Sequence, residues 1–63
     1  MKVKYIIDKN ESEFKKTELF KQVIQTFGTN VYINGGRIEV EKNDESKIVQ
    51  ILTHSGLKYQ KAA

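Results

Sequence analysis

The stretch that decides the fold is Thr29-Asn30-Val31-Tyr32-Ile33-Asn34-Gly35-Gly36-Arg37-Ile38-Glu39-Val40-Glu41. Apolar and polar residues alternate on both sides of two glycines, which is typical of a β-hairpin. A tight turn at Gly35 and Gly36, which both tolerate positive φ angles, sets the apolar residues of the two arms opposite one another on one face, as the pairs Ile33–Ile38 and Val31–Val40. A turn at Asn34 and Gly35 would instead set Ile33 opposite a glycine. We therefore expect the first register.

An amphipathic helix is expected before the hairpin. From residue 12 to residue 27, apolar side chains recur at intervals of three and four and form one stripe that faces a sheet: Leu19, Phe20, Val23, Ile24 and Phe27. Asn10 and Glu13 have the spacing of a capping box at the helix start. Gly28 has the position of a helix C-terminal glycine.

The outer parts of the chain predict two more strands and a second helix. Residues 2–8 alternate, with the apolar side given by Val3, Tyr5 and Ile7. After the hairpin, Asp44 or Ser46 begins a helix that ends at Gly56 and has one shared face, made of Ile48, Ile51, Leu52 and Ser55. Residues 57–60 alternate again and are expected to form a short last strand.

The order strand-helix-strand-strand-helix-strand predicts one α+β domain over residues 1–63 with a ferredoxin-like fold. We expect an antiparallel sheet of strand order 4-1-3-2 with both helices on one face. The buried sheet face should contain Val3, Tyr5, Ile7, Val31, Ile33, Ile38, Val40, Leu57 and Tyr59. The outward sheet face should contain Lys2, Lys4, Ile6, Asn30, Tyr32, Asn34, Arg37, Glu39, Glu41, Lys58 and Gln60.

One segment resembles a known family. Residues 31–59, and above all Ile48-Val49-Gln50-Ile51-Leu52-Thr53-His54-Ser55-Gly56-Leu57-Lys58-Tyr59, are similar to the C-terminal half of a heavy-metal-associated (copper-chaperone-like) domain. Such domains also end in a helix, a glycine and a short strand with an aromatic residue, so the resemblance implies a ferredoxin-like fold. Between the first strand and first helix, where that family has two metal-binding cysteines, this chain has Asp8-Lys9-Asn10-Glu11-Ser12-Glu13-Phe14. The resemblance therefore does not imply copper or zinc binding.

The composition argues against a metal centre, a cofactor and a catalytic site. The chain has no cysteine, and its one histidine, His54, has no second histidine to share a soft metal. Asp8, Glu11 and Glu13 lack the glycine turn of a calcium loop and are expected to cap the helix instead. No nucleophile-base arrangement or phosphate-binding loop is present. We expect no metal, no cofactor and no enzyme activity.

The charge and hydropathy indicate a cytoplasmic protein that does not enter a membrane. Eleven basic residues against eight acidic residues give a net charge of +3, and the two signs are interspersed along the chain. The first residues have no apolar run of the length found in a signal peptide, and no later run could span a bilayer. A small secreted domain usually has disulfides that compensate for its small core, so a chain of this length without cysteine favours an intracellular location.

These exclusions leave a non-catalytic interaction module as the hypothesis. Residues 29–33 form an edge strand without charge or proline, which favours strand addition by a protein partner or by a second copy in a homodimer. The candidate partner-binding residues are Tyr32, Ile6, Phe14 and Arg37. A small regulator is compatible with this reading.

The alternative hypothesis is nucleic-acid binding. The expected sheet platform has only one outward aromatic residue, Tyr32, and Glu39 and Glu41 would repel phosphates at its centre. Binding would therefore use lysines of the first helix, namely Lys15, Lys16 and Lys21.

Overall fold

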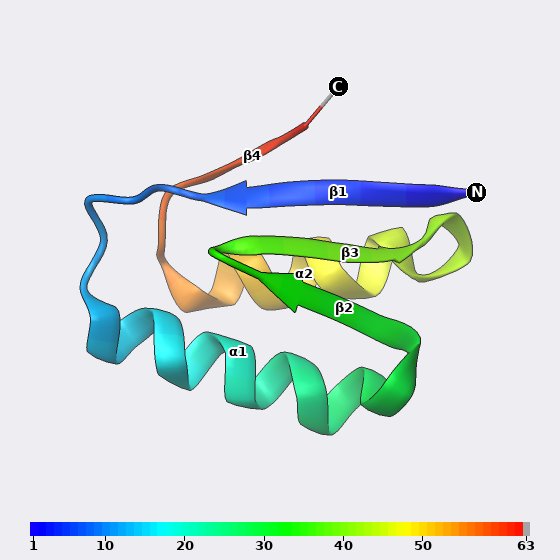
Figure 1. Ribbon diagram of the computed structural model, residues 1–63, viewed down its shortest axis with the longest axis horizontal. Coiled ribbons are helices and arrows are strands. Elements are labelled where there is room, and N and C mark those ends of the chain that lie inside the picture. The colour runs from blue at the N-terminus through cyan, green and yellow to red at the C-terminus, as the bar shows by residue number, and fades with distance from the viewer. Residues whose placement is uncertain (63) are drawn as a thin grey trace.

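The computed structural model describes residues 1–62 and has the predicted ferredoxin-like α+β arrangement (Figure 1). Its elements are β1 (Lys2–Ile7), α1 (Glu13–Phe27), β2 (Val31–Asn34), β3 (Arg37–Glu41), α2 (Glu45–Ser55) and β4 (Tyr59–Lys61). Short 3-10 turns, Gly28–Asn30 and Lys42–Asp44, lead into β2 and α2. The predicted number, order and type of elements are confirmed.

The four strands form one antiparallel sheet in the order β2-β3-β1-β4, as predicted. In the hairpin, β2 and β3 pair in the expected register, Ile33 with Ile38 and Val31 with Val40. The turn residues Gly35 and Gly36 have φ angles of 58° and 83°. Two successive positive φ angles are those of a tight turn whose twist matches the strands, which explains why glycines occupy both positions.

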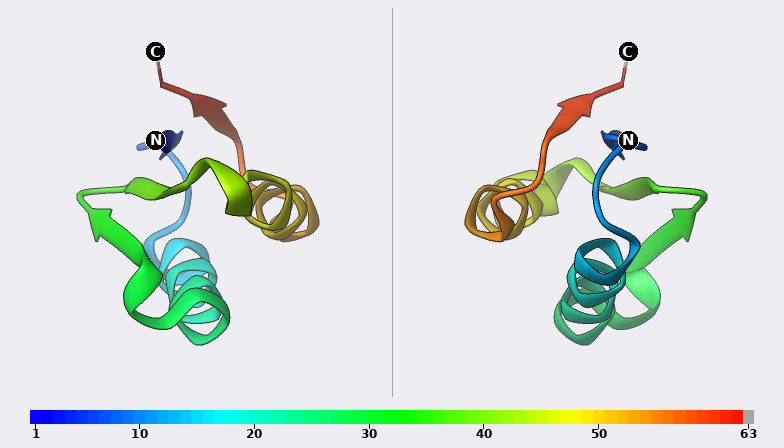
Figure 2. Two further views of the ribbon diagram at one scale, coloured as in Figure 1. Left: turned by 90° about the vertical axis from the view of Figure 1, so that its right-hand side faces the viewer. Right: turned by 90° about the vertical axis from the view of Figure 1, so that its left-hand side faces the viewer.

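The helices α1 and α2 cover one face of the curled sheet and leave the other face bare (Figure 2). The side chains between the two layers form a single core of eleven buried residues: Val3, Tyr5, Ile7, Leu19, Val23, Phe27, Ile38, Val40, Ile48, Leu52 and Leu57. Within residues 1–62, neither helix has the length and apolar character needed to cross a bilayer.

The start of α1 differs from the prediction. Ser12, not Asn10, is the N-cap, and its Oγ accepts the amide of Lys15 at 3.5 Å. The Asn10 amide donates to Asp8 Oδ1 at 2.8 Å, so residues 8–10 form an Asx-type turn of their own. The predicted capping box of Asn10 and Glu13 is therefore wrong, because the turn at Asp8 delays the helix by two residues.

The predicted apolar stripe of α1 is also too wide. Leu19, Val23 and Phe27 are buried, but Phe20 is only partly buried and Ile24 is 53% exposed. Because β2 is the last strand on this side of the sheet, nothing covers the margin of α1 that extends past it. The prediction that Ile24 is a core residue is therefore wrong.

The last strand begins later than predicted, at Tyr59 instead of residue 57. Leu57 is a core residue, and the Lys58 amide donates to Glu11 Oε2 at 2.6 Å. These two residues are held by the core and by the loop between β1 and α1. Pairing with β1 consequently starts with Tyr59 opposite Ile7.

Candidate protein-binding surface

The β2 strand forms one margin of the sheet. In the described part of the chain its only strand neighbour is β3, so the opposite side of its backbone has no strand partner. A two-residue hairpin closes with a hydrogen-bonded pair, here Asn34 with Arg37, and hydrogen-bonded pairs then alternate along the ladder. The N–H and C=O groups of Tyr32 therefore face β3, and those of Val31 and Ile33 face outward. We call this outward row the β2 edge.

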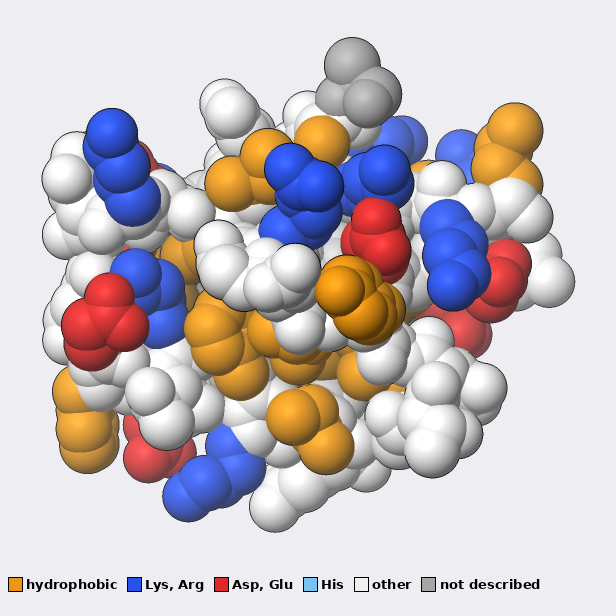
Figure 3. Space-filling model, viewed as in Figure 1, with side chains coloured by type: hydrophobic (Ala, Val, Ile, Leu, Met, Phe, Trp, Pro, Cys, Tyr) orange, Lys and Arg blue, Asp and Glu red, His pale blue; other side chains and the backbone are white. Residues whose placement is uncertain are grey.

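The side of the β2 edge that adjoins α1 is apolar. Val31 and Ile33 of β2 are only partly buried, since no further strand covers them. Phe20 and Ile24 lie on the flank of α1 opposite Gln22, the residue that faces α2. This flank therefore lies toward β2. Figure 3 shows hydrophobic side chains gathered between β2 and α1, with most charged side chains around them. We call Phe20, Ile24, Val31 and Ile33 the edge patch.

The other side of β2 belongs to the bare sheet face and is marked by Tyr32. Its side chain is 51% exposed, and its Oη accepts the Asn34 Nδ2 donor at 3.3 Å. Beside it lies an open hollow of about 300 Å³ whose lining includes Lys2, Val31 and Glu41. Tyr32 thus presents an aromatic ring beside the hollow. A partner side chain could fill the hollow and pack against this ring.

Three of the four predicted partner-binding residues share this bare face. In the sheet register Arg37 lies between Asn34 and Ile6, and Tyr32 lies opposite Glu39. Arg37 is exposed and Ile6 is half-buried. Glu39 is bound by Lys4 from the next strand, Nζ to Oε1 at 3.4 Å.

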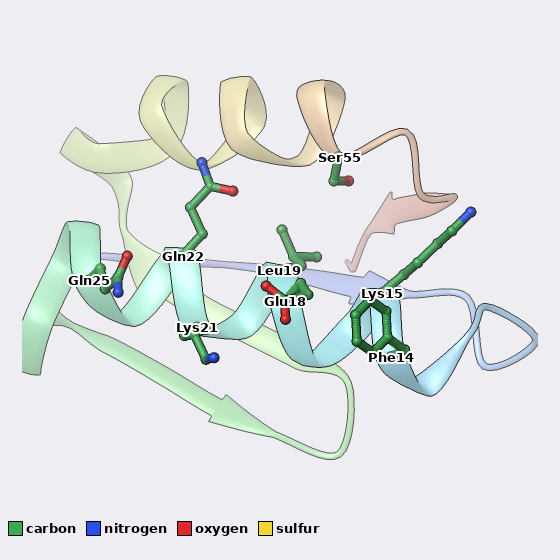
Figure 4. A pocket seen from close by; sticks show the side chains of 8 residues that line it. All are labelled: Phe14, Lys15, Glu18, Leu19, Lys21, Gln22, Gln25 and Ser55. Atoms are coloured by element: carbon green, nitrogen blue, oxygen red, sulfur yellow. The ribbon is translucent and has the colours of Figure 1, made fainter.

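Phe14 lies elsewhere. It is 73% exposed in the first turn of α1, on the helical side of the molecule, and does not adjoin Tyr32. It borders a groove of about 340 Å³ between the helices, into which Gln22 and Ser55 extend (Figure 4). The structure therefore divides the predicted residues between two surfaces, with Phe14 alone on the second.

The α1 lysines do not form a continuous basic patch. The Lys16 ammonium binds Glu13 Oε1 at 2.9 Å, and its side chain is 11% exposed. Lys15 and Lys21 border the interhelical groove together with Glu18. At 3.6 residues per turn, Lys15, Lys16 and Lys21 leave the helix in directions at least about 100° apart. Such a spread is unlike the single basic stripe of a phosphate-binding surface.

The polar residues considered as metal ligands have other roles in the structure. The His54 ring Nδ1 lies 2.9 Å from the Gln50 carbonyl oxygen. Asp8 accepts the Asn10 amide and Glu11 accepts the Lys58 amide, so these acids hold the loop before α1. Among residues 1–62 no three histidine, cysteine or acidic side chains gather as a metal-binding group.

No protein-family model, curated protein or solved structure matches this chain. The resemblance of residues 31–59 to heavy-metal-associated domains therefore stays a prediction.

The sequence predicts the outward position of Tyr32 and the uncharged edge, but it assigns all four residues of the edge patch to the core, where Val31, Ile33 and Phe20 are only partly buried and Ile24 is exposed. For Phe20 and Ile24 the reason is that helical periodicity identifies an apolar stripe but does not show how much of that stripe the sheet covers. One signal could have indicated their exposure. The stripe has five apolar residues, which is more than the last strand of a small sheet can cover.

Proposed function

We propose that this protein is a small non-catalytic interaction module that binds another polypeptide at the β2 edge. The observation that carries the proposal is the combination of an unpaired, uncharged strand with an exposed apolar flank. The segment from Thr29 to Asn34 has no charge and no proline, which are the features that usually protect a sheet margin.

Binding would proceed by strand addition. An extended segment of the partner would pair with the outward backbone groups of Val31 and Ile33, and its alternate side chains would cover Phe20 and Ile24. Tyr32 would contact the partner from the bare face. The backbone bonds supply affinity, and the patch and the Tyr32 hollow supply selectivity.

A regulatory role in the cytoplasm fits this proposal, since a protein without a catalytic site can alter the activity of another protein only by binding it. The support for the compartment is compositional: the chain has no cysteine, whereas small secreted domains usually depend on disulfides.

The test is capture of partners from the native cell by tagged wild type and variants. Ile33→Lys adds a charge at the edge, and its matched control is Ile51→Lys, another partly buried isoleucine, which lies on α2. Tyr32→Ala is matched by Phe14→Ala, an exposed aromatic on the helical side. We expect Ile33→Lys to lose the partners, Tyr32→Ala to bind them more weakly, and both controls to keep them. Retention by all four variants would contradict the proposal.

Nucleic-acid binding through Lys15, Lys16 and Lys21 is the competing proposal. Its support is the net charge of +3 and the exposure of Lys15 and Lys21. A salt titration with mixed-sequence oligonucleotides tests it, since phosphate contacts give an affinity that falls steeply with salt. Binding at low salt that Lys15→Gln and Lys21→Gln both weaken would support this function. No binding at low salt would eliminate it.

A further inference from the structure

We propose that the occupant of the β2 edge is a second copy of this chain, paired β2 to β2 in antiparallel orientation about a two-fold axis at Tyr32. This inference rests on the proposed function and names its partner. The result is a continuous sheet of eight strands with the four helices on one face. Its support lies in the hydrogen-bonding register, the charges at the two sheet margins and the edge patch.

The register follows from which backbone groups are free. Opposite residues of two antiparallel strands lie on the same face, so a symmetric pairing must keep inward residues opposite inward residues. The outward N–H and C=O groups belong to Val31 and Ile33. Only a two-fold axis at Tyr32 sets each Val31 opposite the Ile33 of the other copy, so that both residues of β2 form hydrogen-bonded pairs at once. With the axis at Val31 or at Ile33, only that residue would form a hydrogen-bonded pair with the other β2. The second outward residue would then lie opposite a residue outside the strand.

The charges favour self-association at this margin and oppose it at the other. With the axis at Tyr32, Asn30 lies opposite Asn34 of the second copy, so no charged residue of one β2 meets a charged residue of the other. The opposite sheet margin is β4, which has three residues and includes Lys61, with Lys58 just before it. Lysines and short length are what protects a sheet edge from pairing. β2 has four residues and none of them is charged, so no lysine protects the β2 edge.

The side chains are self-complementary as well. On the helical side, the Phe20 and Ile24 flank of each α1 lies beside the margin where the two copies meet, so each edge patch covers the other. On the bare face, Tyr32 lies opposite Tyr32 of the second copy in a non-hydrogen-bonded pair, the position where cross-strand side chains come closest. One symmetric contact therefore covers both exposed patches, as an isologous interface requires.

A cysteine crosslink tests both the dimer and its register. Because the chain has no native cysteine, Tyr32→Cys introduces a single thiol, and the pairing brings it opposite its own copy at a distance suited to a disulfide. Under oxidised glutathione we expect Tyr32→Cys to form a covalent dimer rapidly. Asn34→Cys, which would face Asn30 of the other copy, and Phe14→Cys should form it much more slowly. Equal rates for the three variants would overturn the register.

Sedimentation equilibrium of the cysteine-free protein tests the association itself. We expect a reversible wild-type dimer whose dissociation constant rises about tenfold or more with Ile33→Lys, which corresponds to about 1.4 kcal/mol, and stays unchanged with Ile51→Lys. A wild-type protein that stays monomeric at about millimolar concentration would overturn self-pairing. The two proposals can fail separately: a monomer whose cellular partners are lost with Ile33→Lys refutes only the second copy as occupant. A dimer unaffected by Ile33→Lys excludes this edge as its interface.

Discussion

The carboxylate of Glu45 joins three separate parts of the chain. It accepts the Tyr5 hydroxyl at 2.7 Å, and it binds the Lys61 ammonium at 2.8 Å and that of Lys42 at 3.1 Å. The Lys61, Tyr5 and Lys42 donors lower the pKa of Glu45 from 4.5 to about 2. Burial, followed by the bond to Glu45, raises the pKa of Tyr5 from 10.0 to about 12. One residue at the start of α2 therefore fixes β1 and β4 to the helix.

This depressed pKa predicts an acid-dependent loss of stability. Because the charged carboxylate is favoured in the folded state, Glu45 stabilises the protein fully above the unfolded pKa of 4.5 and ceases to do so as the pH falls toward about 2. We expect the difference in urea midpoint between wild type and Glu45→Gln to be large at neutral pH and to shrink through this window. A difference that is the same at both ends of the window would contradict this role.

The phenol of Tyr5 predicts the opposite dependence at high pH. Its raised pKa means that the protonated form is favoured in the folded state, so its contribution is present below 10 and is lost as the pH rises toward about 12. Tyr5→Phe should cost about 1 kcal/mol at neutral pH and should not show this alkaline loss. Tyr32→Phe is the matched control, since its hydroxyl is on the exposed face. Denaturant unfolding at neutral and alkaline pH compares the three proteins.

At the scale of the elements, the β2–β3 hairpin depends on the positive φ angles of its turn residues. Gly35 has a φ of 58°, and a Cβ added there would have no atom of a more distant residue within 4 Å, so a substitution tests the backbone angle without a clash against the rest of the fold. Gly35→Ala should destabilise the fold by about 1 kcal/mol, because an alanine in this region crowds its own carbonyl. Gly35→Asn should cost clearly less, because asparagine adopts these angles more readily. Thermal unfolding of both variants measures the difference; equal losses would show that φ is not the cause.

At the scale of the whole molecule, the small core limits what the monomer can withstand. A chain of 63 residues buries a smaller share of its surface than larger domains do, and here part of the apolar surface of α1 and β2 stays at the margin of the sheet. Pairing of two copies at the β2 edge would add to the buried surface. Association would then contribute directly to the stability of the fold.

This coupling predicts that thermal stability depends on protein concentration. Between about 10 μM and about 1 mM, the Tm of the wild type should rise by several degrees, because dimerisation stabilises only the folded chain. The Tm of Ile33→Lys should be nearly constant over the same range, while Ile51→Lys should follow the wild type. Differential scanning calorimetry distinguishes these cases. A constant wild-type Tm would argue against a folded dimer.

The candidate surface was only partly predictable from the sequence. Tyr32 could be assigned to an outward position because strand alternation leaves two choices, and the hairpin pairs decide between them. Ile24 could not, because its exposure depends on where the sheet ends above α1. The sequence makes Phe14 and Tyr32 partner-binding candidates, and both are exposed. That they lie on different sides of the molecule could not be predicted, because no local pattern relates the start of a helix to a strand in the other layer.

By itself the sequence determined the local structure: the Gly35-Gly36 turn, the pairing of Ile33 with Ile38, the helix end at Gly56 and the order of the elements. These features depend on backbone angles and on periodicities of two and 3.6 residues, which neighbouring residues set. The tertiary structure alone decided that Glu45 joins Tyr5 to Lys61, and that Phe20 and Ile24 lie beside an unpaired strand. Such contacts join residues far apart in the chain, and they exist only once the layers have packed and the sheet has ended at β2.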